Sequence, residues 1–224
     1  IINLIIKPSN LNINNEVIND FQKAIDYIAS EKSVAGVIIS TEHNNYNFNY
    51  DLNYLYSLNE PVLIFENITK LSKSLRKLET LGKPIVSLIS GPVSLGGLEI
   101  ILHSHYNIAD AESETQFIFK NLKYELIPSI GASQRLPRQI GIEQSLKLFL
   151  NDKIINTEEA LKIKLIDKIS PKDKRIEQAK EYILNNLISV QPWDDKKHIS
   201  KQPTPFSNDN LSYFISKIAM LHSN

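Results

Sequence analysis

Residues 82–102 have the sequence GKPIVSLISGPVSLGGLEIIL, and this stretch decides how the chain folds. Ile85–Ile89 is a short apolar run, as expected for a buried parallel strand. A turn containing Gly and Pro follows, and the sequence from Gly96 onward predicts a helix. The whole stretch from Ile85 to Leu102 is largely apolar and long enough to suggest a membrane span. Its internal Gly and Pro residues and Glu99 instead indicate a strand, a turn and a buried helix, so no membrane span is expected.

The same stretch carries a candidate for acid–base chemistry. The first N–H groups of a helix lack partners and carry a partial positive charge, which suits a negatively charged oxygen. Gly96 lets a ligand approach the backbone closely, and Glu99, three residues later, lies on the same face. This arrangement could polarise a thioester carbonyl while a proton moves nearby. The spacing alone favours a simpler interpretation, in which Glu99 only complements the helix N-terminus.

The flanking sequence alternates between strand and helix patterns. Strands are expected at residues 2–7, 34–39, 85–89, 106–109 and 116–119, and helices around 17–28, 68–81, 146–150, 157–163 and 176–187. Residues 43–59 show no clean period and are interpreted as a loop that has room for a short helix. Such alternation predicts an α/β domain with a largely parallel sheet and helices outside the strands.

Composition narrows the possible functions. The 224 residues suffice for one large domain, or for one domain plus an appendage. Lys and Arg total 25 and Asp and Glu total 25, so no net charge attracts nucleic acid or an anionic membrane. The chain has no cysteine, which excludes disulfides, thiolate catalysis and cysteine-ligated metals and fits a cytoplasmic protein. No metal site is expected.

Four segments follow one known pattern in order. In the stretch above, Gly91, Gly96, Gly97 and Glu99 match a KP-led strand followed by N-G-x-A-x-G-G-G-x-E. The other three are VAGVIISTEHNNYNFNYDL, QFIFKNLKYELIPSIGASQRLPRQIG and NTEEALKIKLIDKI. Together they resemble the crotonase family of enoyl-CoA hydratases and isomerases, closest to the hydratase domain of multifunctional fatty acid β-oxidation proteins. The resemblance implies a ClpP/crotonase-like spiral of ββα units with a C-terminal helical segment.

The resemblance also assigns site residues. Crotonases bind acyl-CoA and stabilise a thioester enolate with two backbone N–H groups, which correspond here to Tyr50 and Gly96. The first of the two glutamates that hydratases use corresponds to Glu99. The second falls on Asn121, which can hold a water but cannot take a proton at neutral pH. Glu125, four residues on, stands where the family has a glycine. Loss of the second acid favours a hydratase over an isomerase.

Further departures from the family pattern point to a divergent copy. Leu95 replaces the first of three glycines, and Phe48 and Tyr50 replace small residues in the loop that supplies the first N–H donor. Lys164 replaces a helix-capping glycine, where a left-handed conformation costs roughly 1 kcal/mol. His103 and His105, two positions apart, are interpreted as structural because that spacing does not put them on one helix face.

The C-terminal part is expected to be a separate region. Residues 1–188 are assigned to the hydratase domain, and residues 189–224 to a linker and the start of a helical extension, truncated relative to multifunctional proteins. The sequence PWD at residues 192–194 resembles the junction that precedes a 3-hydroxyacyl-CoA dehydrogenase domain in those proteins. No G-x-G-x-x-G loop is present, so no cofactor is expected on this chain, and coenzyme A arrives with the substrate.

Two functions follow from the resemblance. The first is a lyase, an enoyl-CoA hydratase acting on an acyl-CoA thioester, with a dehydrogenase domain or further copies of the chain as partners. The second is a catalytically inactive acyl-CoA-binding or scaffold module of the same fold, left after the site lost its second glutamate.

Overall fold

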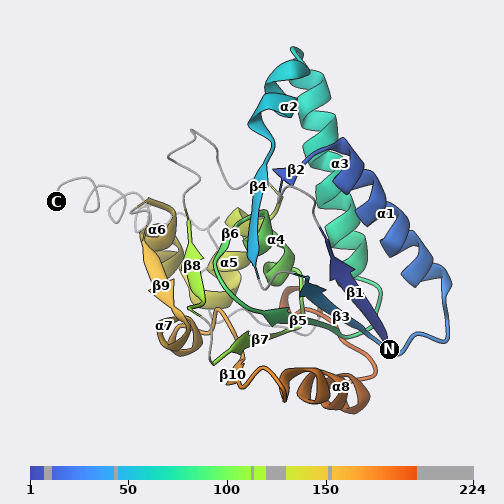
Figure 1. Cartoon of the computed structure of the whole chain (residues 1–224), viewed down its shortest axis with the longest axis vertical. Coiled ribbons are helices and arrows are strands. Elements are labelled where there is room, and N and C mark those ends of the chain that lie inside the picture. Colours follow the sequence, from blue (N-terminus) through green and yellow to red (C-terminus); the bar gives the residue numbers. More distant parts are fainter. Residues whose placement is uncertain (8–11, 43–44, 112–113, 120–129, 151–152, 196–224) are drawn as a thin grey trace.

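Two five-stranded sheets frame the computed structural model, which describes residues 1–7, 12–42, 45–111, 114–119, 130–150 and 153–195 (Figure 1). The first sheet has the parallel order β1 (Ile2–Ile6), β3 (Val37–Thr41), β5 (Ile85–Ile89), β7 (Tyr106–Asp110) and β10 (Lys168–Ser170). All five residues of the central strand β5 are buried. Burial on both faces explains why this strand is a continuous apolar run rather than an alternating one.

The second sheet is formed by strands that alternate along the chain with those of the first sheet. Its order is β2 (Asn12–Ile13), β4 (Tyr46–Tyr50), β6 (Val93–Leu95), β8 (Gln116–Ile118) and β9 (Ile154–Asn156). The first four are parallel, and β9 pairs antiparallel with β8. Along the chain, β1, β3, β5 and β7 are each followed by a strand of the second sheet. Helices follow most of these strand pairs, which confirms the expected α/β spiral of ββα units.

Helices pack on both faces of the first sheet. The described helices are α1 (Asn15–Ser30), α2 (Leu52–Ser57), α3 (Pro61–Glu79), α4 (Gly96–Leu102), α5 (Ala132–Ile140), α6 (Ile142–Leu150), α7 (Thr157–Lys162) and α8 (Arg175–Asn185). α1 and α3 pack together and contribute Ile25 and Leu75 to the main core. α8 forms a smaller core with Ile183 against Val86. α4 is buried at every residue and packs on β4 and β6 of the second sheet.

The structure corrects part of the interpretation of residues 43–59: the short helix is present as α2 (Leu52–Ser57), but a strand precedes it where a loop was expected. Tyr46–Tyr50 forms strand β4, and α2 follows, opened by Asp51, whose side chain accepts the Tyr54 N–H at 2.9 Å. The sequence YNFNY alternates aromatic and polar residues, and Tyr46 and Phe48 are both buried. This is the period of a half-buried strand, and the flanking asparagines obscured it.

Other boundaries differ in smaller ways. β3 begins at Val37 rather than at residue 34, and the turn before α4 contains strand β6. α3 begins at Pro61, where the fixed φ and missing N–H of proline suit a first turn. α5 was not predicted, because Gly131 and Pro137 obscure its helical period. α7 is capped by Asn156, whose side chain accepts the Glu159 N–H at 2.8 Å.

Residues 189–195 pack against the body of the domain. The Ser189 N–H donates to the Gly82 carbonyl at 3.4 Å, and the Gln191 side chain donates to the Ser104 carbonyl at 3.0 Å. The boundary between residues 188 and 189 stays a prediction. Residues 196–224, with the rest of the expected linker and the start of the helical extension, lie outside the described residues.

Candidate active site

The backbone of α4 begins in direct contact with strand β4. A Cβ atom on Gly97 would lie 1.7 Å from the Tyr46 carbonyl oxygen, so no side chain fits there. A Cβ on Gly96 would lie 2.2 Å from Cδ1 of Ile13 and 3.4 Å from the Phe48 carbonyl oxygen. Glycine at both positions therefore lets the first turn of the helix pack against the second sheet.

Strand register brings the two predicted oxyanion donors to the same edge of the second sheet. β4 and β6 pair up to Phe48 opposite Leu95. Gly96 follows Leu95 directly as the first residue of α4, and Tyr50 ends β4 two residues beyond Phe48. Tyr50 and Gly96 therefore lie at the same end of the paired strands β4 and β6. Their joint use as N–H donors stays a prediction.

Glu99 is a buried carboxyl group on α4, only 3% exposed. Its Oε1 accepts the Ile130 N–H at 3.2 Å, and among the described residues Oε2 has no hydrogen-bond partner. Burial raises the pKa of Glu99 to about 7, and the backbone N–H groups of Ile130 and Ala132 and the charge of Arg135 only partly oppose this rise. A carboxyl group that titrates near neutral pH can both take and return a proton, as general acid–base catalysis requires.

The second predicted catalytic position cannot be placed beside Glu99. Asn121 and Glu125 both lie outside the described residues. Of the four assigned site residues, the structure brings together Gly96 and Glu99 on α4 and places the Tyr50 backbone on the adjacent strand. The pairing of Glu99 with Asn121 stays a prediction.

The two histidines after α4 make backbone contacts. His103 Nδ1 lies 2.6 Å from the Glu99 carbonyl oxygen. That oxygen can only accept, so Nδ1 carries the proton. Burial lowers the pKa of His103 to about 4 and keeps the ring neutral. His105 Nδ1 accepts the Ile85 N–H at 3.1 Å, and burial also lowers its pKa. These contacts agree with a structural role for both.

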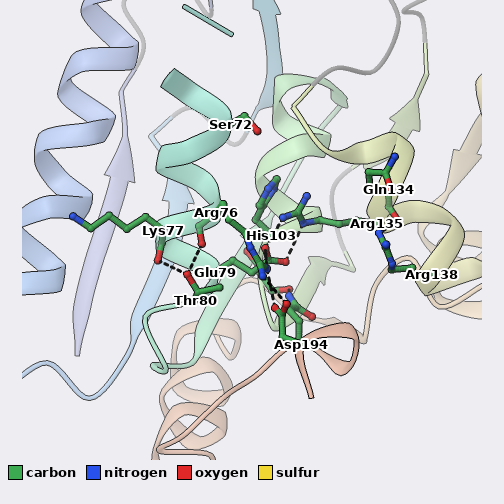
Figure 2. Close-up of polar contacts among 12 residues, drawn as sticks. Ser72, Arg76, Lys77, Glu79, Thr80, His103, Gln134, Arg135, Arg138 and Asp194 are labelled. Carbon is green, nitrogen blue, oxygen red and sulfur yellow. Dashed lines mark hydrogen bonds and ion pairs between the residues drawn. The ribbon is translucent and has the colours of Figure 1, made fainter. Parts of the chain in front are cut away.

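A partly buried group of charges that the sequence interpretation missed lies beside this helix (Figure 2). Glu79, the last residue of α3, accepts from Arg135 Nε at 2.9 Å and from Arg76 Nη1 at 2.6 Å. Arg76 also donates to both carboxylate oxygens of Asp194. Burial acts to raise the pKa of Glu79, but the bonds from the two arginines outweigh it and hold that pKa below its usual value. We call these four residues the Glu79 charge network.

A small apolar cavity of about 30 Å³ lies beside Gly96. Its walls come from β1, β2, β4 and the helices α1, α3 and α4, together with Ile130. The lining residues are Ile6, Ile13, Val17, Phe21, Phe48, Leu71, Leu75, Gly96, Ile100 and Ile130. The cavity has room for about one methyl group or water molecule, and its lining is entirely apolar.

Neither a membrane-spanning helix nor a cluster of metal ligands is found among the described residues. No helix there is both long enough and apolar enough to cross a membrane. The same part of the chain contains no group of three or more His, Asp or Glu side chains placed to hold a metal ion.

Comparison with known proteins gives consistent matches. The "Fatty acid oxidation complex subunit alpha" of Idiomarina loihiensis is 29% identical over 186 residues, which cover 81% of this chain and 26% of that protein. The chain therefore spans about a quarter of the length of that relative. The crystal structure of enoyl-CoA hydratase from Bacillus halodurans superposes with a TM-score of 0.73 at 25% identity, covering 97% of this chain and 89% of that one.

A second solved structure supports the fold alone. The enoyl-CoA hydratase/isomerase from Cupriavidus metallidurans gives a TM-score of 0.75 at 16% identity, covering 100% of this chain and 85% of that one. The family model described as "Enoyl-CoA hydratase/isomerase" matches residues 4–196, which include β4, α4 and the whole Glu79 charge network. The chain belongs to the enoyl-CoA hydratase/isomerase family, the crotonases.

Proposed function

We propose that this chain hydrates 2-enoyl-CoA thioesters to 3-hydroxyacyl-CoA in fatty acid β-oxidation. The observation that carries the proposal is Glu99, a buried carboxyl group with a pKa near 7, three residues after the Gly96 backbone on one helix. Family membership supports the reaction class, and the names of the fatty acid oxidation relatives support the pathway.

The proposed reaction needs one acid–base group and two backbone donors. Ionised Glu99 takes a proton from water as the water oxygen bonds to C3 of the enoyl group. The electron pair moves to the thioester oxygen, where the N–H groups of Tyr50 and Gly96 stabilise the enolate. Glu99 then returns the proton to C2, so the elements of water are added and no other reactant is needed.

Asn121 is proposed to hold the attacking water without a second carboxylate. An amide can both donate to and accept from water, but it does not exchange protons at neutral pH. One carboxylate then performs both proton transfers. The same substitution argues against an isomerase, which would need an acid at this position.

A wider context follows from the relatives. The product is a 3-hydroxyacyl-CoA, which a 3-hydroxyacyl-CoA dehydrogenase would oxidise. We propose that such a domain or further copies of the chain act beside it in the cytoplasm. The "Glyoxysomal fatty acid beta-oxidation multifunctional protein MFP-a" of Cucumis sativus, 33% identical over 120 residues, supports a multifunctional partner by its name, whereas that name places this relative in the glyoxysome rather than in the cytoplasm.

A second candidate function rests on Asn121. If the lost glutamate is essential, the chain is an inactive acyl-CoA-binding or scaffold module. An assay with crotonyl-CoA separates the two functions. The assay follows loss of the conjugated enoyl-thioester absorbance and identifies the product by chromatography.

The expected result is 3-hydroxybutyryl-CoA formation that Glu99→Gln abolishes. Binding of crotonyl-CoA without turnover would contradict the hydratase and support the second function. Activity gained in Asn121→Glu would then locate the defect at that position.

A further inference from the structure

The carboxylate of Glu99 is held by the turn that leads into α5. Ile130 donates its N–H to Glu99 Oε1 at 3.2 Å, and Ala132, two residues on, is buried at the first position of α5. Between them Gly131 has a φ of +138°, in the region that favours glycine. The position of Glu99 Oε1 therefore depends on where this turn lies.

Arg135 fixes the turn from within α5. Its guanidinium lies beside Gly131. Its backbone N–H also donates to the Gly131 carbonyl at 2.9 Å, a helical bond that does not depend on the side chain. A Cβ atom at residue 131 would lie 2.1 Å from Arg135 Nη1 and 3.4 Å from His103 Cε1. The guanidinium thus occupies the space that a side chain at position 131 would fill. Position 131 is next to Ile130, whose N–H donates to Glu99.

Glu79 fixes the guanidinium in turn. Arg135 Nε and Nη2 each donate to a different oxygen of Glu79, in the two-bond geometry that determines both the position and the plane of an arginine. The Glu79 side chain is completely buried and Arg135 is 8% exposed. Figure 2 shows the two side chains reaching toward each other from α3 and α5, next to His103.

Stability alone is a weak reason for such a pair. Taking two charges out of water costs several kcal/mol, and apolar replacements for a buried ion pair are often neutral or stabilising. A buried ion pair is better explained if it also positions a functional group. Here the contacts run from Glu79 to the Arg135 guanidinium, from the guanidinium to the turn at Gly131, and from the Ile130 N–H to the carboxylate of Glu99.

We propose that Glu79 and Arg135 are positioning residues for Glu99, holding the turn at residues 130–132 so that its backbone N–H sets the place of the Glu99 carboxylate. The inference rests on the proposed function. Among the described residues, the charged or titratable groups linked to Glu99 through these contacts are Arg135 on α5, His103 after α4, Glu79 and Arg76 on α3, and Asp194 beyond α8. Of these, only Arg135 acts on the Glu99 carboxyl as a direct charge.

The test uses Arg135→Lys, Arg135→Met and the double variant Glu79→Leu/Arg135→Met. The first keeps the charge but loses the two-bond geometry, the second loses both, and the third replaces the whole pair by apolar side chains. The double variant leaves no unpaired charge from the pair, so it keeps the test decisive if Arg135→Met fails to fold.

The first readout is the protonation of Glu99, followed by infrared absorption of its protonated carboxyl group against pH. Glu99→Gln identifies the band. We expect the midpoint to rise by about half a pH unit or more in Arg135→Met and in the double variant, because the positive charge and the fixed donor are both lost. In Arg135→Lys a smaller rise is expected.

The second readout is crotonyl-CoA hydration. A displaced catalytic group lowers kcat more than it alters KM, and a misplacement near 1 Å costs about a hundredfold. We expect kcat to fall about 10- to 100-fold in all three variants, with KM within about threefold of the wild type.

The matched control is Arg175→Lys. Arg175 is another buried arginine, paired with Asp110 at 3.1 Å and donating to the Ile89 carbonyl at 2.8 Å. We expect a loss of stability with an unchanged Glu99 midpoint. The proposal is overturned if the folded Arg135 or double variants leave the midpoint and kcat unchanged, or if Arg175→Lys shifts the midpoint equally. The infrared titration needs no turnover, so it decides the proposal even if the protein proves inactive.

Discussion

Replacing Glu99 by glutamine is expected to remove a pH-dependent loss of stability. In the unfolded chain Glu99 titrates near the usual 4.5, whereas burial raises its pKa in the folded protein to about 7. Between these values the folded protein keeps the proton that the unfolded chain has released. This contribution to stability is therefore complete below pH 4.5 and is lost as the pH rises through 7.

The magnitude follows from the pKa. Each pKa unit corresponds to about 1.4 kcal/mol, and Glu99 is 3% exposed, so little solvent screening reduces the effect. Between pH 5 and pH 8 the wild type should lose roughly 2.5 kcal/mol of unfolding free energy through this group. Glu99→Gln cannot ionise, so its advantage over the wild type should grow by the same amount.

Urea unfolding of both proteins at pH 5 and pH 8 measures this change. Comparing the difference at two pH values cancels any fixed effect of the glutamine side chain. Asn156→Ala is the control, because it removes only the cap of α7 and changes no titratable group. The difference in unfolding free energy between this control and the wild type should be the same at both pH values. A Glu99→Gln difference that also stays constant would refute the raised pKa.

Four further substitutions test local features by urea unfolding. Lys164→Gly should stabilise the protein by about 1 kcal/mol, because Lys164 has a φ of +65°, and a loss of stability would contradict this. Gly97→Ala should cost about 3 kcal/mol or more through its clash with the β4 backbone, whereas Gly82→Ala, which meets no atom within 4 Å but has a φ of +70°, should cost only about 1 kcal/mol. Equal costs would argue against the close packing of α4. Asn156→Ala should cost about 1 kcal/mol by removing the cap of α7, and an unchanged midpoint would speak against that cap.

Most of the framework could be predicted because its signals are local. The run Ile85–Ile89 matches β5 at both ends, and the apolar period around Ile25 and Ile28 identifies α1. Lys164 takes the left-handed conformation expected at the position of a family glycine. In each case the deciding information lies within a few residues of the element itself.

The missed elements have weak or mixed local signals. β6 has only three residues, Val93–Leu95, and its existence depends on pairing with β4 and β8. β4 was read as a loop because asparagines, which are depleted in strands, separate its aromatic residues. Pairing with distant strands stabilises both elements, and such contacts are not visible in a short window of sequence.

Only the part of the candidate site on α4 could be predicted from the sequence. The Gly-rich start of α4 marked Gly96 and Glu99. The positioning pair was missed because Glu79 and Arg135 are 56 residues apart in sequence. One signal was available: Glu79 lies four residues after Leu75, on the buried face of α3. A carboxylate at an apolar position requires a partner, although the sequence does not say which.

The rate of crotonyl-CoA hydration as a function of pH, measured together with the binding of crotonyl-CoA, tests the role of Glu99 most directly. If ionised Glu99 is the base, kcat/KM rises with pH and levels off above about pH 7. Glu99→Gln should lower kcat at least about a hundredfold while the Kd for crotonyl-CoA changes less than about threefold. A Glu99→Gln variant that hydrates crotonyl-CoA at the wild-type rate with the same pH dependence would contradict the assignment of Glu99 as the catalytic group.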